Sequence, residues 1–345
     1  RRISGEAKMP QMSVRVGASR AVKRRVFGTQ VIPVVMNTLR ENGTGWLIGV
    51  GASAHVIFLG LMLAHVEPFH TYFYLFAWWT YLPVIGAINY RKSGRSYVIG
   101  GQWQLVWLCS CSLIVWLFFE IWNFRLDNWL YVGVITDLGL RWTVYALAFA
   151  TVLPAVLETD LLFDHLGVAR RVRGLAFQVS ARWLGVSVVL GFVMMALVAL
   201  LPRYCFPLVW VALVLILDPV LYHLDKEASF LGQASRGSYQ RLTRLMLAGL
   251  SCGVLWEFWN YGSGAKWIYD IPFFDQWKVF EMPLPGFLGF MPFALECYLF
   301  WELFRLARKT LVFTDRRYQV LALIVAISYC ALTFYGIDVM TVIWL

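Results

Sequence analysis

The strongest constraint on this chain is a series of long apolar stretches that approach or reach the length needed to cross a lipid bilayer. A transmembrane helix needs about 20 mainly apolar residues. Nine stretches without Lys or Arg come close to this length: 45–66, 72–88, 104–122, 142–157, 183–201, 206–222, 245–260, 284–303 and 319–343. Only 14% of the 345 residues are charged, against about 25% in soluble domains. The sequence therefore predicts an all-α polytopic membrane protein with nine transmembrane helices, and it excludes soluble enzyme folds and disulfide scaffolds.

The distribution of basic residues predicts the orientation of these helices. If the N-terminus is cytoplasmic, 25 of the 30 Lys and Arg residues fall in cytoplasmic segments and 5 fall in outer segments. Short loops rich in Lys and Arg stay on the cytoplasmic side. We therefore expect a multi-pass protein of a bacterial inner membrane, with its N-terminus inside and its C-terminus outside. This topology explains the net charge of +10, so no nucleic-acid partner is expected.

A short motif at the end of the third stretch recurs at the end of the seventh. Glu120-Ile121-Trp122-Asn123 matches Glu257-Phe258-Trp259-Asn260. After one extra residue in the second copy, identities continue at a spacing of 138 residues. They are Trp129 and Trp267, Tyr131 and Tyr269, Asp137 and Asp275, Phe149 and Phe287, Pro154 and Pro292, Leu157 and Leu295, and Glu158 and Glu296. We interpret the chain as two four-helix repeats followed by a ninth helix.

This repeat predicts both the symmetry and the organisation of the chain. Because each repeat has an even number of helices, both copies have the same orientation, and a pseudo-twofold axis along the membrane normal should relate them. The repeats are expected at 45–160 and 183–303. They are joined by a basic cytoplasmic linker at 161–182, and a basic loop and the final helix follow at 304–345. Residues 1–44 form a basic cytoplasmic arm that we expect to lie on the membrane surface as an interfacial helix; the alternative is an arm that docks a partner subunit.

The repeated motif is the first candidate site. Glu120 and Asn123 share one helical face at the outer end of their span, and so do Glu257 and Asn260. Ionisable residues within spans are costly and usually functional. We therefore take both Glu residues as candidate catalytic acids, and the surrounding residues as a ligand-binding or structural polar cluster: Asn123, Asn260, Trp122, Trp259, Trp129, Tyr131, Asp137, Trp267, Tyr269 and Asp275. The alternative is a polar clasp between helices within the aromatic belt.

A second pair of acids follows two prolines. Glu158 and Glu296 come four residues after Pro154 and Pro292, and a proline within a helix frees a carbonyl and often kinks the segment. The two acids are predicted either to clamp kinked helices together or to act as an acid or proton relay.

The sequence contains no metal-binding pattern. His55 is the histidine in the middle of a predicted span. It is either a hydrogen-bonded core residue or, less simply, a single axial ligand of a haem or a chlorophyll-type pigment. A bis-histidine haem needs two histidines at matched depth, and a di-iron site needs Glu-x-x-His pairs. Neither pattern is present, and no metal site is predicted.

These features support three classes of function. The first is an integral membrane subunit or binding module, which packs against membrane lipids and other integral membrane subunits or holds a lipid, a quinone or a pigment. The second is a membrane-embedded enzyme in which a buried Glu protonates an apolar, isoprenoid-like substrate. The third is a proton-coupled transporter that uses the acids as a relay.

The topology can be tested with a reporter fused after Leu345. Nine crossings that begin in the cytoplasm place this residue outside, so an alkaline phosphatase fusion should be active and a green fluorescent protein fusion should be dark. The opposite pair of results would show that the number of crossings is even.

Overall fold

The computed structural model describes residues 31–274, 276–310 and 315–344. Residues 1–39 and 40–345 form two separate units. Of the first unit, residues 31–39 are helical. Residues 1–30 of the arm that we expected to form an interfacial helix lie outside the described residues. All that follows concerns the second unit.

The described chain is mostly helical, as expected of a multi-pass membrane protein. Seven segments are long and apolar enough to cross a bilayer: Gly43–Leu63, Gln102–Leu126, Leu138–Leu166, Ala181–Leu200, Pro202–Leu224, Leu284–Lys309 and Arg316–Met340. Two other predicted spans correspond to α2 (Phe73–Ser93) and α10 (Gln240–Gly262). Both are helices of sufficient length, but they are less apolar than the seven.

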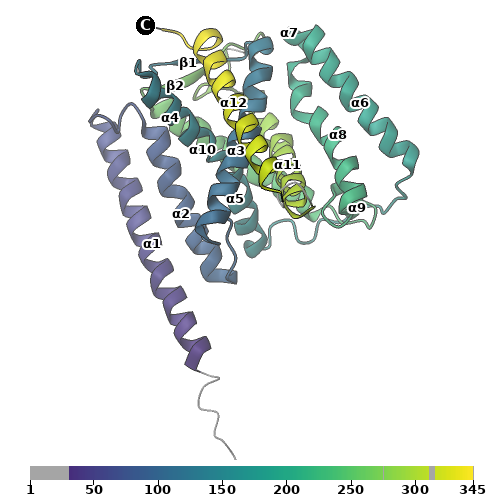
Figure 1. The fold of residues 1–345 in the computed structure, drawn as a ribbon, viewed down its shortest axis with the longest axis horizontal. Coiled ribbons are helices and arrows are strands. Elements are labelled where there is room, and N and C mark those ends of the chain that lie inside the picture. Colours follow the sequence, from purple (N-terminus) through teal and green to yellow (C-terminus); the bar gives the residue numbers. More distant parts are fainter. Residues whose placement is uncertain (1–30, 275, 311–314, 345) are drawn as a thin grey trace, which may run out of the picture. The chain divides into compact units, whose positions relative to one another are not determined.

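The remaining elements are short connections and the helices that form these segments (Figure 1). The helices are α1 (Val31–Leu63), α3 (Gln102–Leu126), α4 (Leu138–Phe149), α5 (Val152–Leu166), α6 (Ala181–Leu200), α7 (Pro202–Cys205), α8 (Val209–Leu224), α9 (Phe230–Ala234), α11 (Phe290–Thr310) and α12 (Arg316–Met340). Two 3₁₀ turns, η1 (Phe206–Leu208) and η2 (Leu284–Gly289), precede α8 and α11. The strands are β1 (Trp129–Val132), β2 (Lys266–Tyr269), β3 (Lys278–Val279) and β4 (Met282–Pro283).

The helix predicted at 142–157 is divided into α4 and α5. Pro154 lies in the first turn of α5, where its missing N–H is tolerated, and it cannot continue the hydrogen bonding of α4. Ser112 of α3 bridges the break, because its hydroxyl donates to the last carbonyl of α4 and accepts from an amide at the start of α5, at 2.7 and 3.0 Å. Pro292 lies in the first turn of α11, after the 3₁₀ turn η2. The kinks expected at the prolines are therefore helix starts.

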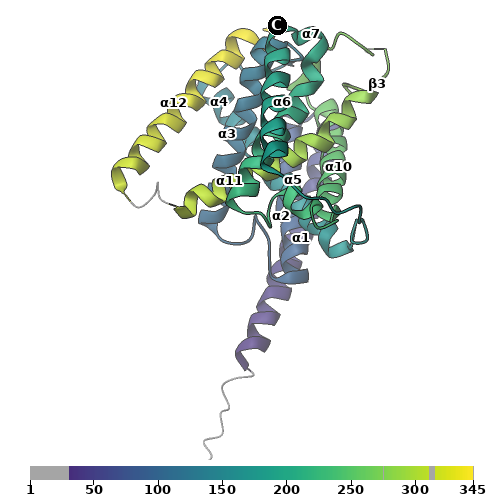
Figure 2. The same ribbon diagram turned by 90° about the vertical axis from the view of Figure 1, so that its right-hand side faces the viewer.

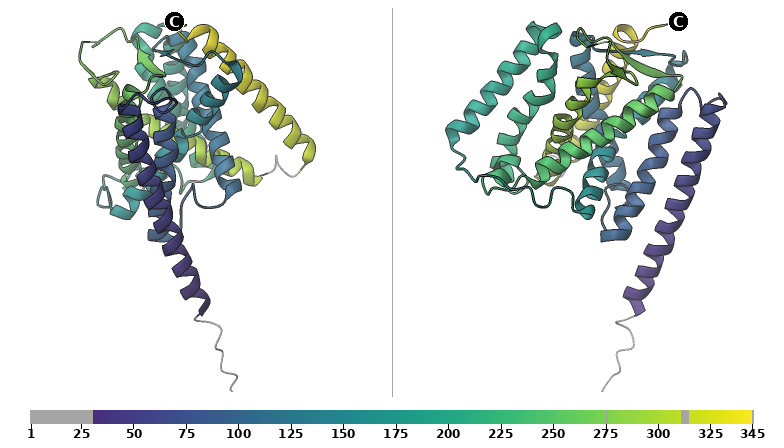
Figure 3. Two further views of the ribbon diagram at one scale, coloured as in Figure 1. Left: turned by 90° about the vertical axis from the view of Figure 1, so that its left-hand side faces the viewer. Right: turned by 180° about the vertical axis from the view of Figure 1, so that it is seen from behind.

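Four helices, α3, α5, α10 and α11, form the centre of the second unit. α3 and α10 each pack against both α5 and α11. α2 packs on α5 and α10, and α8 packs on α11. α6 lies along α8, and the part of α1 after residue 40 lies beside α2, as Figures 1 and 3 show. Phe119 of α3, Phe293 of α11 and Trp78 of the adjacent α2 are among the largest fully buried side chains.

Two short strands cover one end of the central helices. β1 follows α3 and β2 follows α10, and they pair antiparallel with Trp129 opposite Tyr269 and Tyr131 opposite Trp267. The segment after α12 continues this sheet, because the amide of Tyr131 donates to the carbonyl of Thr341 at 2.7 Å and its carbonyl accepts from the amide of Ile343 at 2.8 Å. β3 and β4 form a separate two-stranded pair.

The last helix, α12, is anchored near its C-terminal end by a buried ion pair. Arg141 of α4 donates two hydrogen bonds to the carboxylate of Asp338, at 2.8 and 2.9 Å. Trp142 and Tyr145 donate to the same carboxylate. Towards Arg316, α12 diverges from α3 (Figure 2), and most of its side chains there are exposed. The position of α12 therefore depends on the contacts near its C-terminal end.

Replacing Asp338 with Asn should destabilise the protein strongly. The change leaves the buried Arg141 guanidinium without its countercharge, and breaking one partner of a buried ion pair costs about 3–5 kcal/mol. Thermal unfolding in detergent measures the effect. The matched control is Glu227→Gln, which breaks the two-bond ion pair with Arg236 at the surface, where such pairs contribute little. Equal effects of both variants would contradict the anchoring role of Asp338.

Candidate functional site

The two asparagines of the repeated motif each fix the strand that follows their own helix. The Asn123 side chain accepts from the amide of Trp129 at 3.2 Å and donates to its carbonyl at 2.8 Å. The Asn260 side chain makes the same two bonds with Trp267, both at 2.9 Å. Both asparagines are fully buried. Because backbone groups that leave a helix lack intrahelical partners, each side-chain amide satisfies the chain where it turns into a strand.

The two glutamates of the motif hold the aromatic side chains of the same strands. Oε1 of Glu120 accepts from Tyr131 Oη at 2.5 Å, from Trp116 Nε1 at 2.7 Å and from Trp129 Nε1 at 3.2 Å. Oε1 of Glu257 accepts from Tyr269 Oη at 2.8 Å. Both carboxyl groups are fully buried, and their second oxygens have no hydrogen-bond partner among the described residues. The hydrogen bonds of the Glu and Asn side chains of each motif lie within its own half of the chain.

These contacts keep the two tyrosines of the strands protonated. Burial, and then the adjacent carboxylate, raises the pKa of Tyr131 well above the ordinary value of 10.0. The same two causes raise the pKa of Tyr269. Both hydroxyls therefore remain hydrogen-bond donors to their glutamates over the whole neutral and moderately alkaline range.

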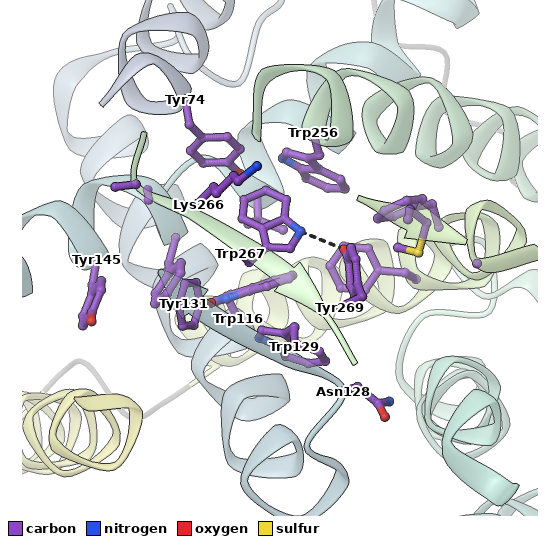
Figure 4. Close-up of a pocket in the computed structure, with 18 of the residues that line it drawn as sticks. Tyr74, Trp116, Asn128, Trp129, Tyr131, Tyr145, Trp256, Lys266, Trp267 and Tyr269 are labelled. Carbon is purple, nitrogen blue, oxygen red and sulfur yellow. Dashed lines mark hydrogen bonds between the residues drawn. The ribbon is translucent and has the colours of Figure 1, made fainter. Parts of the chain in front are cut away.

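The aromatic rings of the strands line a cavity of about 160 Å³, which we name the aromatic cavity (Figure 4). Cross-strand neighbours in an antiparallel pair lie on the same face, so all four rings of β1 and β2 reach it. Other rings come from α2, α3, α4, α8, α10 and α11. The aromatic and charged members of the wall are Tyr72, Tyr74, Trp116, Trp129, Tyr131, Tyr145, Phe149, Phe206, Trp210, Trp256, Lys266, Trp267, Tyr269, Phe290 and Phe293. No Asp or Glu is among the described residues of this wall.

The structure divides the motif residues predicted from the sequence into three groups. Trp129, Tyr131, Trp267 and Tyr269 form part of the wall. Glu120, Asn123, Glu257 and Asn260 do not line the cavity, but they bond to the residues that do. The third group lies elsewhere: Trp259 packs against His55 and Trp78, Trp122 packs against the cluster between α6 and α8, and Asp137 caps α4 at the surface. Asp275 lies outside the described residues.

The second pair of acids differs between the two halves. Glu158 accepts hydrogen bonds from Asn89 Nδ2 at 2.6 Å, from Ser96 Oγ at 2.5 Å and from the amide of Val98 at 2.8 Å. It therefore joins α5 to α2 and to the turn after α2. Glu296 is fully buried in α11, and neither of its carboxyl oxygens has a hydrogen-bond partner among the described residues. Neither acid lines the aromatic cavity.

His55 makes the contacts of a core histidine. Its Nδ1 is 2.8 Å from the hydroxyl of Thr80, which donates to a carbonyl one turn earlier in α2. Its ring packs against Trp259, with a centroid distance of 5.3 Å. In the part of the chain that the structure describes, no group of three or more His, Cys, Asp and Glu side chains is arranged to hold a metal ion.

Several residues of the wall were not identified from the sequence. Trp210, Tyr145, Phe290 and Phe293 lie in helices of a chain that is 17% aromatic, so composition gave no signal for them. Lys266 is the charged residue of the wall, and its Nζ lies 2.6 Å from Glu281 Oε1.

The chain matches no protein-family model, no curated protein and no solved structure.

The state of the two tyrosines can be tested by a spectroscopic titration. At about pH 11, Tyr131→Phe or Tyr269→Phe should leave the tyrosinate absorbance of the folded protein unchanged, because neither hydroxyl ionises there. After unfolding, each variant should absorb less by one tyrosinate. A raised folded-state pKa also means that the unfolded chain releases this proton first, so stability should fall as the pH rises above 10. A drop in folded-state absorbance in either variant would contradict the hydrogen bonds to the glutamates.

Proposed function

We propose that this protein is a membrane-embedded binding module that holds a lipophilic ligand in the aromatic cavity. The observation that carries the proposal is the wall itself, in which rings of both β1 and β2 converge with rings of six helices. Ligand sites are concave and mainly apolar, with few polar groups. The glutamates and asparagines of the repeated motif fix the orientation of these rings. In this proposal the motif shapes the binding site without contacting the ligand.

The size of the cavity limits what it holds. Pockets for drug-sized ligands measure about 300–1,000 Å³, and this cavity is about 160 Å³. An apolar cavity of about 150 Å³ engineered in another protein binds benzene. The aromatic cavity therefore accommodates one ring, or the end of a longer lipid, quinone or pigment whose remaining part extends towards the membrane.

The enzyme and transporter alternatives receive less support. A catalytic acid must come within hydrogen-bond distance of the atom that it protonates, and none of the four candidate acids lines the cavity. Oε1 of Glu120 and Oε1 of Glu257 each accept a hydrogen bond from a tyrosine hydroxyl of the wall. Glu158 holds a turn, and no chain of hydrogen bonds links Glu296 to another acid among the described residues. Binding agrees with these contacts better than proton transfer does.

The strand pairing supports the proposed two-repeat architecture. Trp129 corresponds to Trp267 and Tyr131 to Tyr269, so exchanging the two copies converts each cross-strand pair into the other. An antiparallel pair with this register has a local twofold axis perpendicular to it. We propose that this axis runs along the membrane normal. This axis would relate the two four-helix repeats. We further propose that the less apolar helices α2 and α10 also cross the membrane, and that α12 is the ninth crossing.

The same arrangement suggests where partners contact the protein. In α1 and α12 the most apolar windows are only 6% and 17% buried within the chain. We propose that membrane lipids and other integral membrane subunits cover these helices, and that the C-terminus lies on the outer side with the aromatic cavity. The proposed role is thus a subunit that carries a lipophilic ligand within a membrane complex.

The binding proposal is tested by filling the cavity. Ala148 of α4 lines it, and Ala148→Leu adds three carbon atoms to the wall. The protein purified in mild detergent should release a lipophilic molecule on organic extraction, at about one per chain by mass spectrometry. The variant should carry at least about fivefold less, because overpacking a filled site costs about 1–3 kcal/mol.

The matched control is Ala322→Leu on α12, a residue that does not line the cavity. It should retain the molecule at the wild-type ratio. The proposal would be wrong if wild-type protein released no molecule beyond bulk lipid and detergent, or if Ala148→Leu and Ala322→Leu released equal amounts.

A further inference from the structure

The aromatic cavity contains a hydrogen-bond donor that the protein leaves unused, the indole N–H of Trp256. Trp256 is 4% exposed and lines the cavity, and its Nε1 has no hydrogen-bond partner among the described residues. In Figure 4 this nitrogen lies on the side of the ring towards Tyr74. More than about 90% of buried polar groups in proteins are hydrogen-bonded. An unpaired N–H in a cavity wall is therefore a position where a ligand can supply the missing acceptor.

Three other donors of the wall are already engaged. The hydroxyls of Tyr131 and Tyr269 donate to the two glutamates of the motif. Trp267 Nε1 donates to Tyr269 Oη at 2.9 Å. Among the described residues of the wall, only Trp256 has a buried polar atom without a partner.

The two halves of the chain differ at this position. At the spacing of 137 residues that relates the two motifs, Trp256 corresponds to Phe119, which has no N–H. The free donor is thus specific to the second half. Trp256 packs against Phe290 and Phe293, with centroid distances of 5.7 and 5.9 Å. A ligand that reaches its N–H must therefore be apolar and ring-like, with one acceptor atom on this side.

We infer that the ligand is a lipophilic ring ketone, such as the head of a quinone, whose carbonyl oxygen accepts a hydrogen bond from Trp256 Nε1. This inference rests on the proposed function and specifies the ligand class for the same cavity. A pure hydrocarbon would leave the N–H unpaired. An anionic head group would find Lys266 already paired with Glu281, so a neutral carbonyl fits the wall better than a phosphate or a carboxylate.

The test compares two probes of nearly equal shape, 4-fluoroacetophenone and 4-fluoro-α-methylstyrene, which differ by a carbonyl oxygen in place of a methylene group. Binding to the full chain in detergent is followed by ¹⁹F NMR, with protein-free micelles as the reference for partitioning. The ketone should bind about three- to tenfold more tightly than the alkene, which is the range expected for one net hydrogen bond.

Two variants assign this preference to one residue. Trp256→Phe keeps an aromatic ring and removes the N–H, so the two probes should bind it equally. Trp78→Phe is the matched control, because Trp78 Nε1 is also buried without a hydrogen-bond partner among the described residues, but Trp78 does not line the cavity. This variant should keep the full preference for the ketone.

A second measurement does not depend on the folding of any variant. In protein labelled with ¹⁵N-tryptophan, the ketone should shift one indole N–H resonance downfield, and the alkene should not. Equal binding of both probes to the wild type, or a preference that survives in Trp256→Phe, would overturn the inference and leave the binding function intact. Binding of neither probe above the micelle reference would overturn the proposed function as well.

Discussion

The hydrogen bonds between two buried asparagines and the strands that follow them support the rest of the site. At the edge of a membrane, backbone groups that leave a helix need partners within the protein. A side-chain amide supplies a donor and an acceptor together, and Asn123 and Asn260 use both on the backbone of a tryptophan. Because each strand is fixed immediately after its helix, the side chains that alternate along it have fixed directions.

The acids of the motif bind the polar atoms of the rings that these strands carry. Glu120 and Glu257 accept hydrogen bonds from hydroxyl and indole donors, so the polar atoms of these rings are occupied within the protein. This arrangement explains how a cluster that contains Glu, Asn, Tyr and Trp surrounds a cavity with a mainly apolar wall. It also explains why buried acids in a span do not by themselves indicate catalysis.

The two halves are similar in their backbone contacts and differ in their polar details. Glu120 accepts hydrogen bonds from three side chains. Glu257 accepts a hydrogen bond from the hydroxyl of Tyr269, and this hydroxyl accepts one from the indole N–H of Trp267. Glu158 is fully engaged, whereas its counterpart Glu296 has no partner among the described residues. The cavity wall differs as well, because Trp256 lines it with an indole N–H that has no partner among the described residues, whereas Phe119 at the corresponding position has no N–H.

The sequence by itself determined the membrane class, the positions of the main helices and the motif that fixes the strands. These properties follow from local apolar length and from the recurrence of Glu and Asn at one spacing, which need no knowledge of distant contacts. Only the tertiary structure decided that Pro154 begins a helix, that Trp122 and Trp259 lie away from the site, and that Trp210, Trp256 and Phe293 belong to it. Aromatic residues make up 17% of the chain, so composition cannot select the few that converge. That selection is made by the antiparallel pairing of β1 and β2, which brings together segments more than a hundred residues apart.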